Sequence, residues 1–328
     1  MKLKITSISY HLPELIEGVE KLQADNPDWI MPKILDKTGI ITRHIAAHDE
    51  TAVDLAYAAG IKLLNNDSVK PEEIDLLILV TQSPDYVLPS SACILQDKLG
   101  LSKNCMAFDV NLGCSGFVYA LSIAGGLIES GVANKGIILC ADTYTKYIDK
   151  DNRTCRPIFS DGAAAVFVER SETDDIGPFE FGTDGSGFDK LIVKGSGARE
   201  SNGISEQPHG TLEMHGSNVF LFTMSVVPKS VENLLERTSK TLEDIDLIVF
   251  HQASKLVIDT LIQRLSLDVN KVFSNYASVG NTVSATIPIA LKDAVSQGRL
   301  HNGDTVMVVG FGVGLSWGAT LIDWSMEK

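Results

Sequence analysis

The stretch Pro71-Glu-Glu-Ile-Asp-Leu-Leu-Ile-Leu-Val-Thr-Gln82 recurs, with few changes, as Thr241-Leu-Glu-Asp-Ile-Asp-Leu-Ile-Val-Phe-His-Gln252. Each copy contains a run of apolar residues, rich in Leu, Ile and Val, that ends at a polar residue. A strand exposed on one side alternates apolar with polar residues, whereas a strand covered on both faces is apolar throughout. Both copies therefore predict buried central strands of a layered α/β fold.

The similarity between the two regions continues beyond these strands. Each is followed by a helical pattern, a second short strand, a turn of small residues and a further helix that ends at a glycine. The matching positions are Leu99 and Leu265, Ala107-Phe108 and Val272-Phe273, Cys114 and Asn281, and Gly131 and Gly298. A period of roughly 170 residues is too long for a solenoid and favours duplication of a whole α/β half. We predict two similar halves, residues 1–170 and 171–328.

Other segments fit the same architecture. Three further apolar runs, Gly136–Cys140, Ala164–Val168 and Thr305–Val309, are predicted to be buried strands. Residues Gly116–Glu129 and Ala285–Val295 have the apolar spacing of helices. Buried strands that alternate with helices are typical of sheets covered by helices.

The composition is that of a folded, acidic protein. The 328 residues are 44% hydrophobic, and 42 acidic residues against 28 basic ones give a net charge of −14. This charge disfavours non-specific binding to nucleic acid, because a polyanion would be repelled. No uncharged apolar stretch reaches the roughly 18 residues of a membrane span, and Met1–Tyr10 is predicted to be a strand rather than a signal peptide. We therefore expect a cytoplasmic protein.

The five cysteines match no zinc module or disulfide framework. They are Cys93, Cys105, Cys114, Cys140 and Cys155. Their number is odd and no Cys-x-x-Cys pair occurs, so we expect reduced thiols and no metal site. Only Cys114 lies in a glycine-containing turn, Asn111-Leu-Gly-Cys-Ser-Gly116, between a predicted strand and a predicted helix. Amides at the start of a helix stabilise a thiolate and can hold an oxyanion. The alternative is a small buried side chain that suits a tight turn.

Two polar residues of the second half are expected to lie close to Cys114. His251 follows a predicted central strand, and Asn281 occupies the turn that matches the turn of Cys114. Ligands of open α/β sheets bind beyond the carboxyl ends of the strands, so the three side chains would share one site. Taken singly, His251 could be a hydrogen-bonded structural residue and Asn281 a turn former. The stretch Gly310–Gly318 has no lysine and does not match a phosphate loop, so we interpret it as a turn between strands whose amides face the site.

Seven short motifs occur in the order and near the spacing of a known family. They are Thr38-Gly-Ile with Arg43-His-Ile-Ala-Ala47, Leu88-Pro-Ser-Ser-Ala-Cys93, Ala107-Phe-Asp-Val with Gly113-Cys-Ser-Gly-Phe117, Phe159-Ser-Asp-Gly-Ala163, His251-Gln-Ala253, Gly280-Asn-Thr282, and Gly310-Phe-Gly with Trp317-Gly318. By these motifs the chain resembles β-ketoacyl-acyl-carrier-protein synthase III, of the thiolase superfamily, over nearly its whole length. The resemblance implies a thiolase-like, five-layered αβαβα fold of two similar halves, and a homodimer.

The resemblance also implies a catalytic site made of Cys114, His251 and Asn281. Cys114 would take an acyl group from acyl-coenzyme A (acyl-CoA) or from an acyl carrier protein (ACP), and the amides of Cys114 and Val313 would hold the oxyanion. His251 and Asn281 would stabilise the enolate that forms when malonyl-ACP loses CO2. That carbanion would attack the acyl group to give a β-ketoacyl-ACP. Such chemistry needs neither a metal nor a redox cofactor.

The residues that the resemblance assigns to substrate binding depart in part from the family pattern. They are Lys33, Lys37, Leu88, Arg153, Phe220 and Ser254. Lys33 and Lys37 stand where a Trp and an Arg commonly flank the nucleotide, and Trp29 is displaced. The two lysines are therefore expected to meet phosphates but not to stack on adenine. Leu88 stands where bacterial housekeeping enzymes often have Phe at the acyl gate, so we hypothesise a roomier or differently shaped acyl pocket.

Docking of an acidic carrier protein would need a local basic patch, because the chain is acidic overall. Lys229, Lys255, Arg264 and Lys271 are candidates, since they lie near the predicted helices of the second half. The alternative is that these four are ordinary solvated charges.

The sequence leaves other functions open. An enzyme of the same fold could pass the acyl group from Cys114 to an amine or a hydroxyl. The presence of both His251 and Asn281 favours condensation, because simple transfer has less need of two enolate donors. The order Cys, His, Asn also fits a papain-like hydrolase, which the half-repeat and the buried strands disfavour. A non-catalytic scaffold is disfavoured because all three reactive positions are filled. Neither the acyl primer nor the pathway follows from the sequence.

Overall fold

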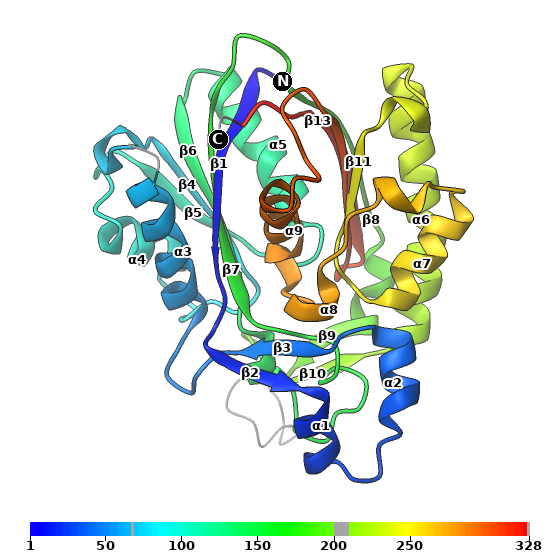
Figure 1. Ribbon diagram of the computed structural model, residues 1–328. Helices are drawn as coiled ribbons and strands as arrows, with labels where there is room; N and C mark the ends of the chain where they lie inside the picture. Colours follow the sequence, from blue (N-terminus) through cyan, green and yellow to red (C-terminus); the bar gives the residue numbers. More distant parts are fainter. Residues whose placement is uncertain (67–68, 200–209, 327–328) are drawn as a thin grey trace.

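The chain folds into five stacked layers of helices and sheets (Figure 1). The computed structural model describes residues 1–66, 69–199 and 210–326. Two β-sheets face each other across a central layer of two helices, α5 (Gly116–Glu129) and α9 (Thr286–Ser296). Further helices cover the outer face of each sheet. This αβαβα order is the fold predicted from the sequence.

All strands of the first sheet come from the first half of the chain. Their order is β1 (Leu3–His11), β7 (Gly162–Arg170), β6 (Lys135–Asp142), β4 (Leu76–Val80) and β5 (Met106–Val110). β4 lies parallel to β5 and β6, whereas β7 lies antiparallel to β1 and β6. Helices α3 (Ala52–Asn66) and α4 (Ser91–Lys98) cover the outer face.

The second sheet repeats this arrangement with strands from the second half. Their order is β8 (Ile176–Thr183), β13 (Ser316–Asp323), β12 (Thr305–Gly312) and β11 (Leu247–Phe250). Ile248 of β11 forms a parallel bridge to Val272, which takes the place that β5 has in the first sheet. Parallel and antiparallel pairs fall at the same positions in both sheets. Helices α6 (Gly216–Thr238) and α7 (Lys255–Arg264) cover the outer face.

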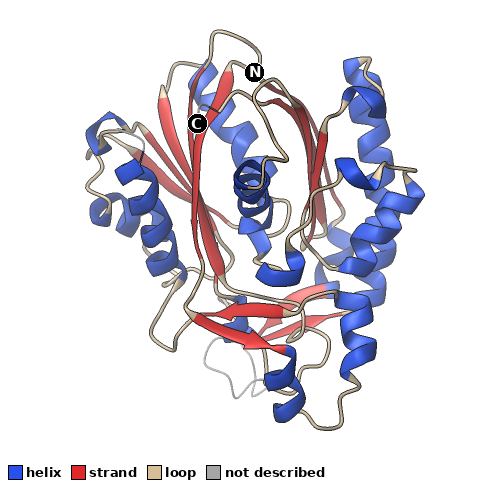
Figure 2. Cartoon of the chain, in the orientation of Figure 1, coloured by secondary structure: helices blue, strands red, loops and turns tan. Residues whose placement is uncertain are grey.

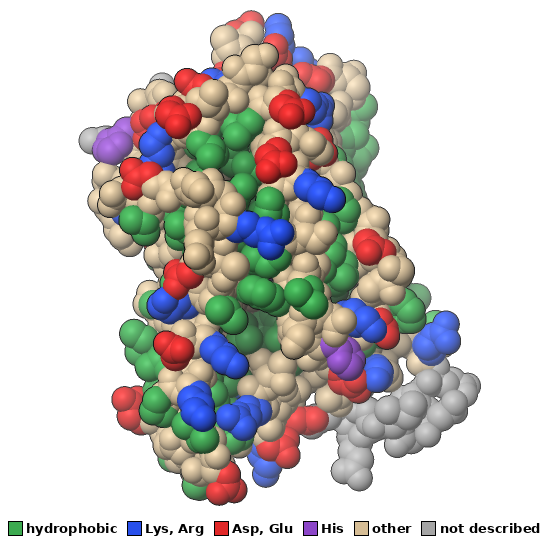
Figure 3. All heavy atoms as spheres, turned by 90° about the vertical axis from the view of Figure 1, so that its right-hand side faces the viewer, with side chains coloured by type: hydrophobic (Ala, Val, Ile, Leu, Met, Phe, Trp, Pro, Cys, Tyr) green, Lys and Arg blue, Asp and Glu red, His purple; other side chains and the backbone are tan. Residues whose placement is uncertain are grey.

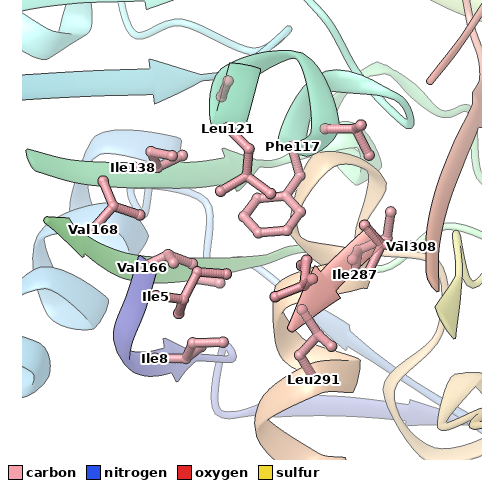
Figure 4. Close-up of a cluster of buried hydrophobic side chains, with 14 of the residues drawn as sticks. Ile5, Ile8, Phe117, Leu121, Ile138, Val166, Val168, Ile287, Leu291 and Val308 are labelled. Atoms are coloured by element: carbon pink, nitrogen blue, oxygen red, sulfur yellow. The ribbon is translucent and has the colours of Figure 1, made fainter. Parts of the chain in front are cut away.

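The two central helices are apolar on most sides because a sheet lies against each face of their layer. Phe117 and Leu121 of α5 and Ile287 of α9 are fully buried in one cluster (Figure 4). The same cluster contains strand residues of both sheets, among them Ile5, Ile8, Ile138, Val166, Val168 and Val308. Burial of one such side chain stabilises the fold by about 1.5–3 kcal/mol. The two halves therefore share one core.

Shorter elements cover the ends of the sheets at which the parallel strands finish (Figure 2). They are β2 (Leu15–Gly18), α1 (Val19–Asp25), α2 (Met31–Thr38), β3 (Thr42–Ile45), β9 (Leu191–Lys194), β10 (Thr211–Met214) and α8 (Tyr276–Val279). The sequence patterns predicted none of these elements, because each is short. Among the described residues, no helix combines the length and apolarity that a membrane crossing requires.

Candidate active site

The turn between β5 and α5 holds Cys114 against the second half of the chain. The thiol is buried, and the turn packs on glycines at the end of β12. A Cβ on Gly312 would lie 2.8 Å from Cys114 Sγ, and a Cβ on Gly310 would lie 2.8 Å from Ser115 Cα. Glycine at both positions therefore allows the turn of one half to approach the turn of the other.

His251 lies directly after β11. Its amide donates to the carbonyl oxygen of Val309 (2.8 Å), and its buried ring meets Phe311 edge-on with ring centroids 5.6 Å apart. Nδ1 of the ring lies 2.7 Å from Thr286 Oγ1. Burial lowers the pKa of His251 to about 3, so the imidazole is neutral at physiological pH.

Asn281 is fixed by a short parallel bridge to the first half. The amide of Ser160 donates to the carbonyl oxygen of Asn281 (2.9 Å), and the amide of Asn281 donates to that of Ile158 (3.0 Å). The side-chain Oδ1 accepts from the amide of Val283 (2.9 Å). This bond turns Nδ2 towards His251 Nε2, which lies 3.4 Å away. The carboxamide therefore presents its donor side to the imidazole.

The electrostatics of Cys114 differ from the stabilised thiolate that the sequence predicted. Burial raises the pKa of Cys114 to about 12, and the charge of Asp142 adds to this rise. The amides of Val313 and of Cys114 itself lower the pKa but do not outweigh burial. Burial also raises the pKa of Asp142 to about 7. The resting thiol is therefore protonated at neutral pH, and it has to lose its proton during any reaction.

One cavity of about 830 Å³ contains all three side chains on its wall. The buried Cys114, His251 and Asn281 lie at its inner end. The exposed side chains of Lys33, Lys37 and Arg153 lie on the same wall and mark the mouth. The cavity therefore leads from solvent to the thiol, as a site for a long substrate with a reactive end requires.

Comparison with known proteins gives the family. The sequence model described as 3-Oxoacyl-[acyl-carrier-protein (ACP)] synthase III matches residues 108–185, and the model of its C-terminal part matches residues 235–324. The β-ketoacyl-[acyl-carrier-protein] synthase III of Clostridium perfringens is 38% identical over 327 residues, which cover 97% of this chain and 98% of that protein. The chain belongs to the β-ketoacyl-acyl-carrier-protein synthase III family.

Solved structures agree with this assignment. A crystal structure of 3-oxoacyl-(acyl-carrier-protein) synthase III is 42% identical with a TM-score of 0.92, and the match covers 99% of this chain and 100% of that one. The priming β-ketosynthase of the R1128 polyketide pathway is 29% identical with a TM-score of 0.91, and it covers 99% of this chain and 97% of its own. The fold is therefore shared with a synthase of polyketide biosynthesis, and it does not by itself identify the pathway.

All but one of the residues expected around the substrate line the cavity. Phe220 and Ser254 lie on its wall together with the three basic residues at the mouth. Trp29, the displaced tryptophan, does not line the cavity and packs against the buried residues of α1 and α2. Leu88 is 80% exposed in the loop that precedes α4, so within one chain it does not gate the cavity. The prediction of a roomier acyl pocket, which depended on Leu88, therefore has no support within the single chain.

The four expected docking residues are spread over the second half. Lys255 begins α7 beside the wall residue Ser254, and its ammonium is bonded to Asp259. Lys229 is exposed on α6, and Arg264 ends α7. Figure 3 shows this face of the molecule, on which basic and acidic side chains are interspersed.

Lys271, one of the four expected docking residues, lies away from the cavity. Its ammonium donates to the carbonyl oxygens of Leu242 (3.3 Å) and Glu243 (2.9 Å). Those residues precede β11, whereas His251 follows it, so Lys271 lies at the end of the strand away from the site. The sequence placed Lys271 near a helix but could not tell which end of the sheet it would occupy.

Three residues near the thiol were not found from the sequence. Thr286 contacts His251, whereas Tyr144 and Gln82 form a hydrogen-bonded pair next to the turn of Cys114. Thr286 begins α9, the helix that follows Asn281, and a polar residue at the start of this helix indicates a contact with the site. Tyr144 and Gln82 carry no local signal, because the chain brings them together only in the folded state.

Proposed function

We propose that the protein condenses an acyl thioester with malonyl-ACP to give a β-ketoacyl-ACP, with Cys114 as the nucleophile. The observation that carries the proposal is the convergence of Cys114, His251 and Asn281 at the inner end of one cavity, in a member of this family. A thiol, an uncharged imidazole and a carboxamide are the groups that acyl capture and enolate stabilisation need.

In the first step Cys114 Sγ attacks the thioester carbonyl carbon. A new C–S bond forms to Cys114, the C–S bond to the carrier breaks, and the proton of the thiol leaves with the carrier as its free thiol. The amides of Cys114 and Val313, which lower the pKa of the thiol, are proposed to hold the oxyanion. The raised pKa of Cys114 makes transfer of its proton part of this step.

In the second step malonyl-ACP enters and loses CO2. The electron pair of the broken C–C bond becomes an enolate, whose oxygen accepts hydrogen bonds from His251 Nε2 and Asn281 Nδ2. The carbanion then attacks the acyl carbonyl, and Cys114 leaves as a thiolate that is protonated again. Loss of CO2 supplies the electron pair, so the proposed reaction uses no metal ion and no redox cofactor.

Lys33, Lys37 and Arg153 are proposed to bind the phosphates of an acyl-CoA or of the phosphopantetheine arm of ACP. All three are exposed at the mouth of the cavity. Phe220 lies on the wall between the mouth and the buried side chains, where it suits the apolar part of such an arm. Lys255, Lys229 and Arg264 remain candidates for contacts with the acidic carrier protein.

A homodimer is proposed from two exposed features of the first half. β5 is the edge strand of its sheet and pairs only with β4 among the described residues. The loop beside it exposes Tyr86, Val87 and Leu88 by 60%, 88% and 80%. An open edge next to apolar side chains is a template for pairing with a second copy. Light scattering of the purified protein should report two chains per particle, and one chain at all concentrations would contradict this.

The decisive experiment for the activity joins two measurements. Intact mass after incubation with a panel of acyl thioesters should show one acyl group per chain, and a peptide digest should locate it on Cys114. Addition of malonyl-ACP should then release CO2 and return the free thiol. Cys114→Ala should abolish acyl capture. Acyl capture followed by transfer to an amine or hydroxyl, without release of CO2, would indicate an acyltransferase instead, and peptide cleavage would indicate a hydrolase.

A further inference from the structure

The carboxylate of Asp142 joins the two halves of the chain next to the site. Asp142 ends β6 and is fully buried. One oxygen accepts from the amide of Gln82 just after β4 (2.8 Å), and the other accepts from the amide (3.2 Å) and the hydroxyl (2.5 Å) of Ser284. Ser284 belongs to the second half, in the short helical turn Val283–Ala285 that precedes α9. Asp142 therefore bridges the two halves, although it does not line the cavity.

The turn that Ser284 anchors contains a strained residue. Val283 has a φ of +56°, in the left-handed region that β-branched side chains rarely adopt. Such a conformation costs free energy and persists only where its surroundings hold it. The side chain of Val283 is fully buried in the cluster that contains Cys114. The bonds from the next residue, Ser284, to Asp142 hold its backbone.

The same turn orients both groups that are proposed to bind the enolate. The amide of Val283 donates to Asn281 Oδ1 (2.9 Å), and this bond directs the carboxamide. The carbonyl oxygen of Val283 lies 3.1 Å from Thr286 Oγ1, and that hydroxyl lies 2.7 Å from His251 Nδ1. A shift of Val283 would therefore move the carboxamide directly and the imidazole through Thr286.

We propose that Asp142 is a positioning residue for the condensation step. Through Ser284 it holds the strained turn at Val283 in place, and that turn directs the carboxamide and the imidazole towards one enolate oxygen. The inference rests on the proposed function and extends it to a carboxylate that touches neither the substrate nor the reacting atoms. Acyl capture uses the thiol and the oxyanion amides instead, so a loosened turn should spare that step.

Two variants weaken this anchor in different ways, and a third is their control. Asp142→Asn keeps the shape of the side chain but has one carbonyl oxygen in place of two, so it cannot satisfy both Gln82 and Ser284. Ser284→Ala keeps the carboxylate and its bond to Gln82 but lacks the hydroxyl. Ser9→Ala loses a comparable buried hydroxyl, which donates to the carbonyl oxygen of Ala59 (2.6 Å) between β1 and α3, away from the cavity.

The test measures the two steps of the reaction separately in each protein. Acylation of Cys114 by the acyl-CoA that loads wild type fastest is followed by intact mass, and CO2 release from malonyl-ACP is measured on the acylated protein. Ser284→Ala should capture the acyl group at the wild-type rate and release CO2 about 10–100-fold more slowly, because a small misplacement of the enolate donors costs this much. Asp142→Asn should show the same fall in CO2 release. Its acyl capture should be as fast as that of wild type or faster, because the charge that raises the pKa of Cys114 is gone.

The control and the opposite outcomes complete the test. Ser9→Ala should match wild type in both rates. CO2 release at the wild-type rate in either variant of the anchor would overturn the inference, and so would an equal loss in both steps, which indicates a merely structural role. If Asp142→Asn does not fold, Ser284→Ala decides, because it retains the carboxylate. A wild-type protein that captures an acyl group but releases no CO2 would contradict the proposed function itself, whereas unaffected variants of an active wild type would contradict the inference alone.

Discussion

We predict that the hydroxyl of Thr286 sets the proton position of His251. It has one proton and two neighbours that can accept it, His251 Nδ1 at 2.7 Å and the carbonyl oxygen of Val283 at 3.1 Å. Donation across the shorter contact leaves the imidazole proton on Nε2, the nitrogen that faces Asn281. The 3.4 Å between Nε2 and Asn281 Nδ2 then separates two donors, which suits a shared acceptor such as an enolate oxygen.

Thr286→Val should therefore slow condensation and spare acyl capture. Valine keeps the shape of threonine but cannot donate to Nδ1, so the proton of His251 can shift to the wrong nitrogen. By analogy with the groups that orient metal-bound histidines, loss of this contact should cost about 10–100-fold. The rate of Cys114 acylation should stay unchanged, whereas the rate of CO2 release should fall by about 10–100-fold. Thr286→Ser should restore the rate, and an equal loss in both steps would indicate a merely structural role.

The thiol of Cys114 should react faster as the pH rises, without reaching a plateau below pH 9. The pKa is raised to about 12, so the thiolate fraction grows by about tenfold per pH unit over this range. Ionisation of Asp142, whose pKa is about 7, places a negative charge nearby and should flatten the slope around neutral pH. The rate of alkylation by iodoacetamide, with Cys114 followed by peptide mass, measures this directly. A plateau reached below pH 8 would mean that the amides outweigh burial.

Among the helices and strands, the sequence predicted the buried strands and the two central helices. It missed the short strands that cover the ends of the sheets. The runs that became β4, β6, β7, β11 and β12 are apolar throughout because both faces are covered. The same reason made α5 and α9 recognisable. β2, β3, β9 and β10 are short and mostly half-exposed, and they are stable only because the rest of the chain supports them. Their pairing is a tertiary property, and so is the contact of Tyr144 with Gln82.

Gly310→Ala should inactivate the protein without unfolding it. The new Cβ would lie 2.8 Å from the carbonyl oxygen of Cys114 and from Ser115 Cα, and both are backbone atoms that can move only with the whole turn. We expect a loss of acyl capture of at least about hundredfold and a destabilisation of about 1–3 kcal/mol. Gly126→Ala is the matched control, because nothing lies within 4 Å of its Cβ on the exposed side of α5. It should stabilise the helix by about 0.5–1 kcal/mol and leave activity intact. Thermal unfolding and acyl capture measured together separate the two effects.

For the whole molecule, the duplication explains why the site could be predicted while its surface could not. Each half contributes one turn at the same end of its sheet. The two turns lie in contact because both halves pack on the shared core of α5 and α9. Cys114 and Asn281 were therefore predictable as neighbours once the repeat was seen. Surface charges carry no such constraint, and Lys271 lies at the end of its sheet away from the site.

The mouth of the cavity lies between α2 and α7, which are in contact, and this arrangement makes carrier docking testable. Lys37→Glu and Lys255→Glu reverse exposed charges on either side of this mouth, whereas Lys103→Glu does so in the turn that precedes β5, away from the site. An acidic carrier protein should bind the first two variants more weakly, with a KM for malonyl-ACP raised about tenfold and a weaker dependence on salt. Malonyl-pantetheine has neither the carrier protein nor the phosphate of its arm, so its KM should change little in any variant. Lys103→Glu should behave as wild type with both substrates, and a KM for malonyl-ACP that is equal in all three variants would show that the carrier docks elsewhere.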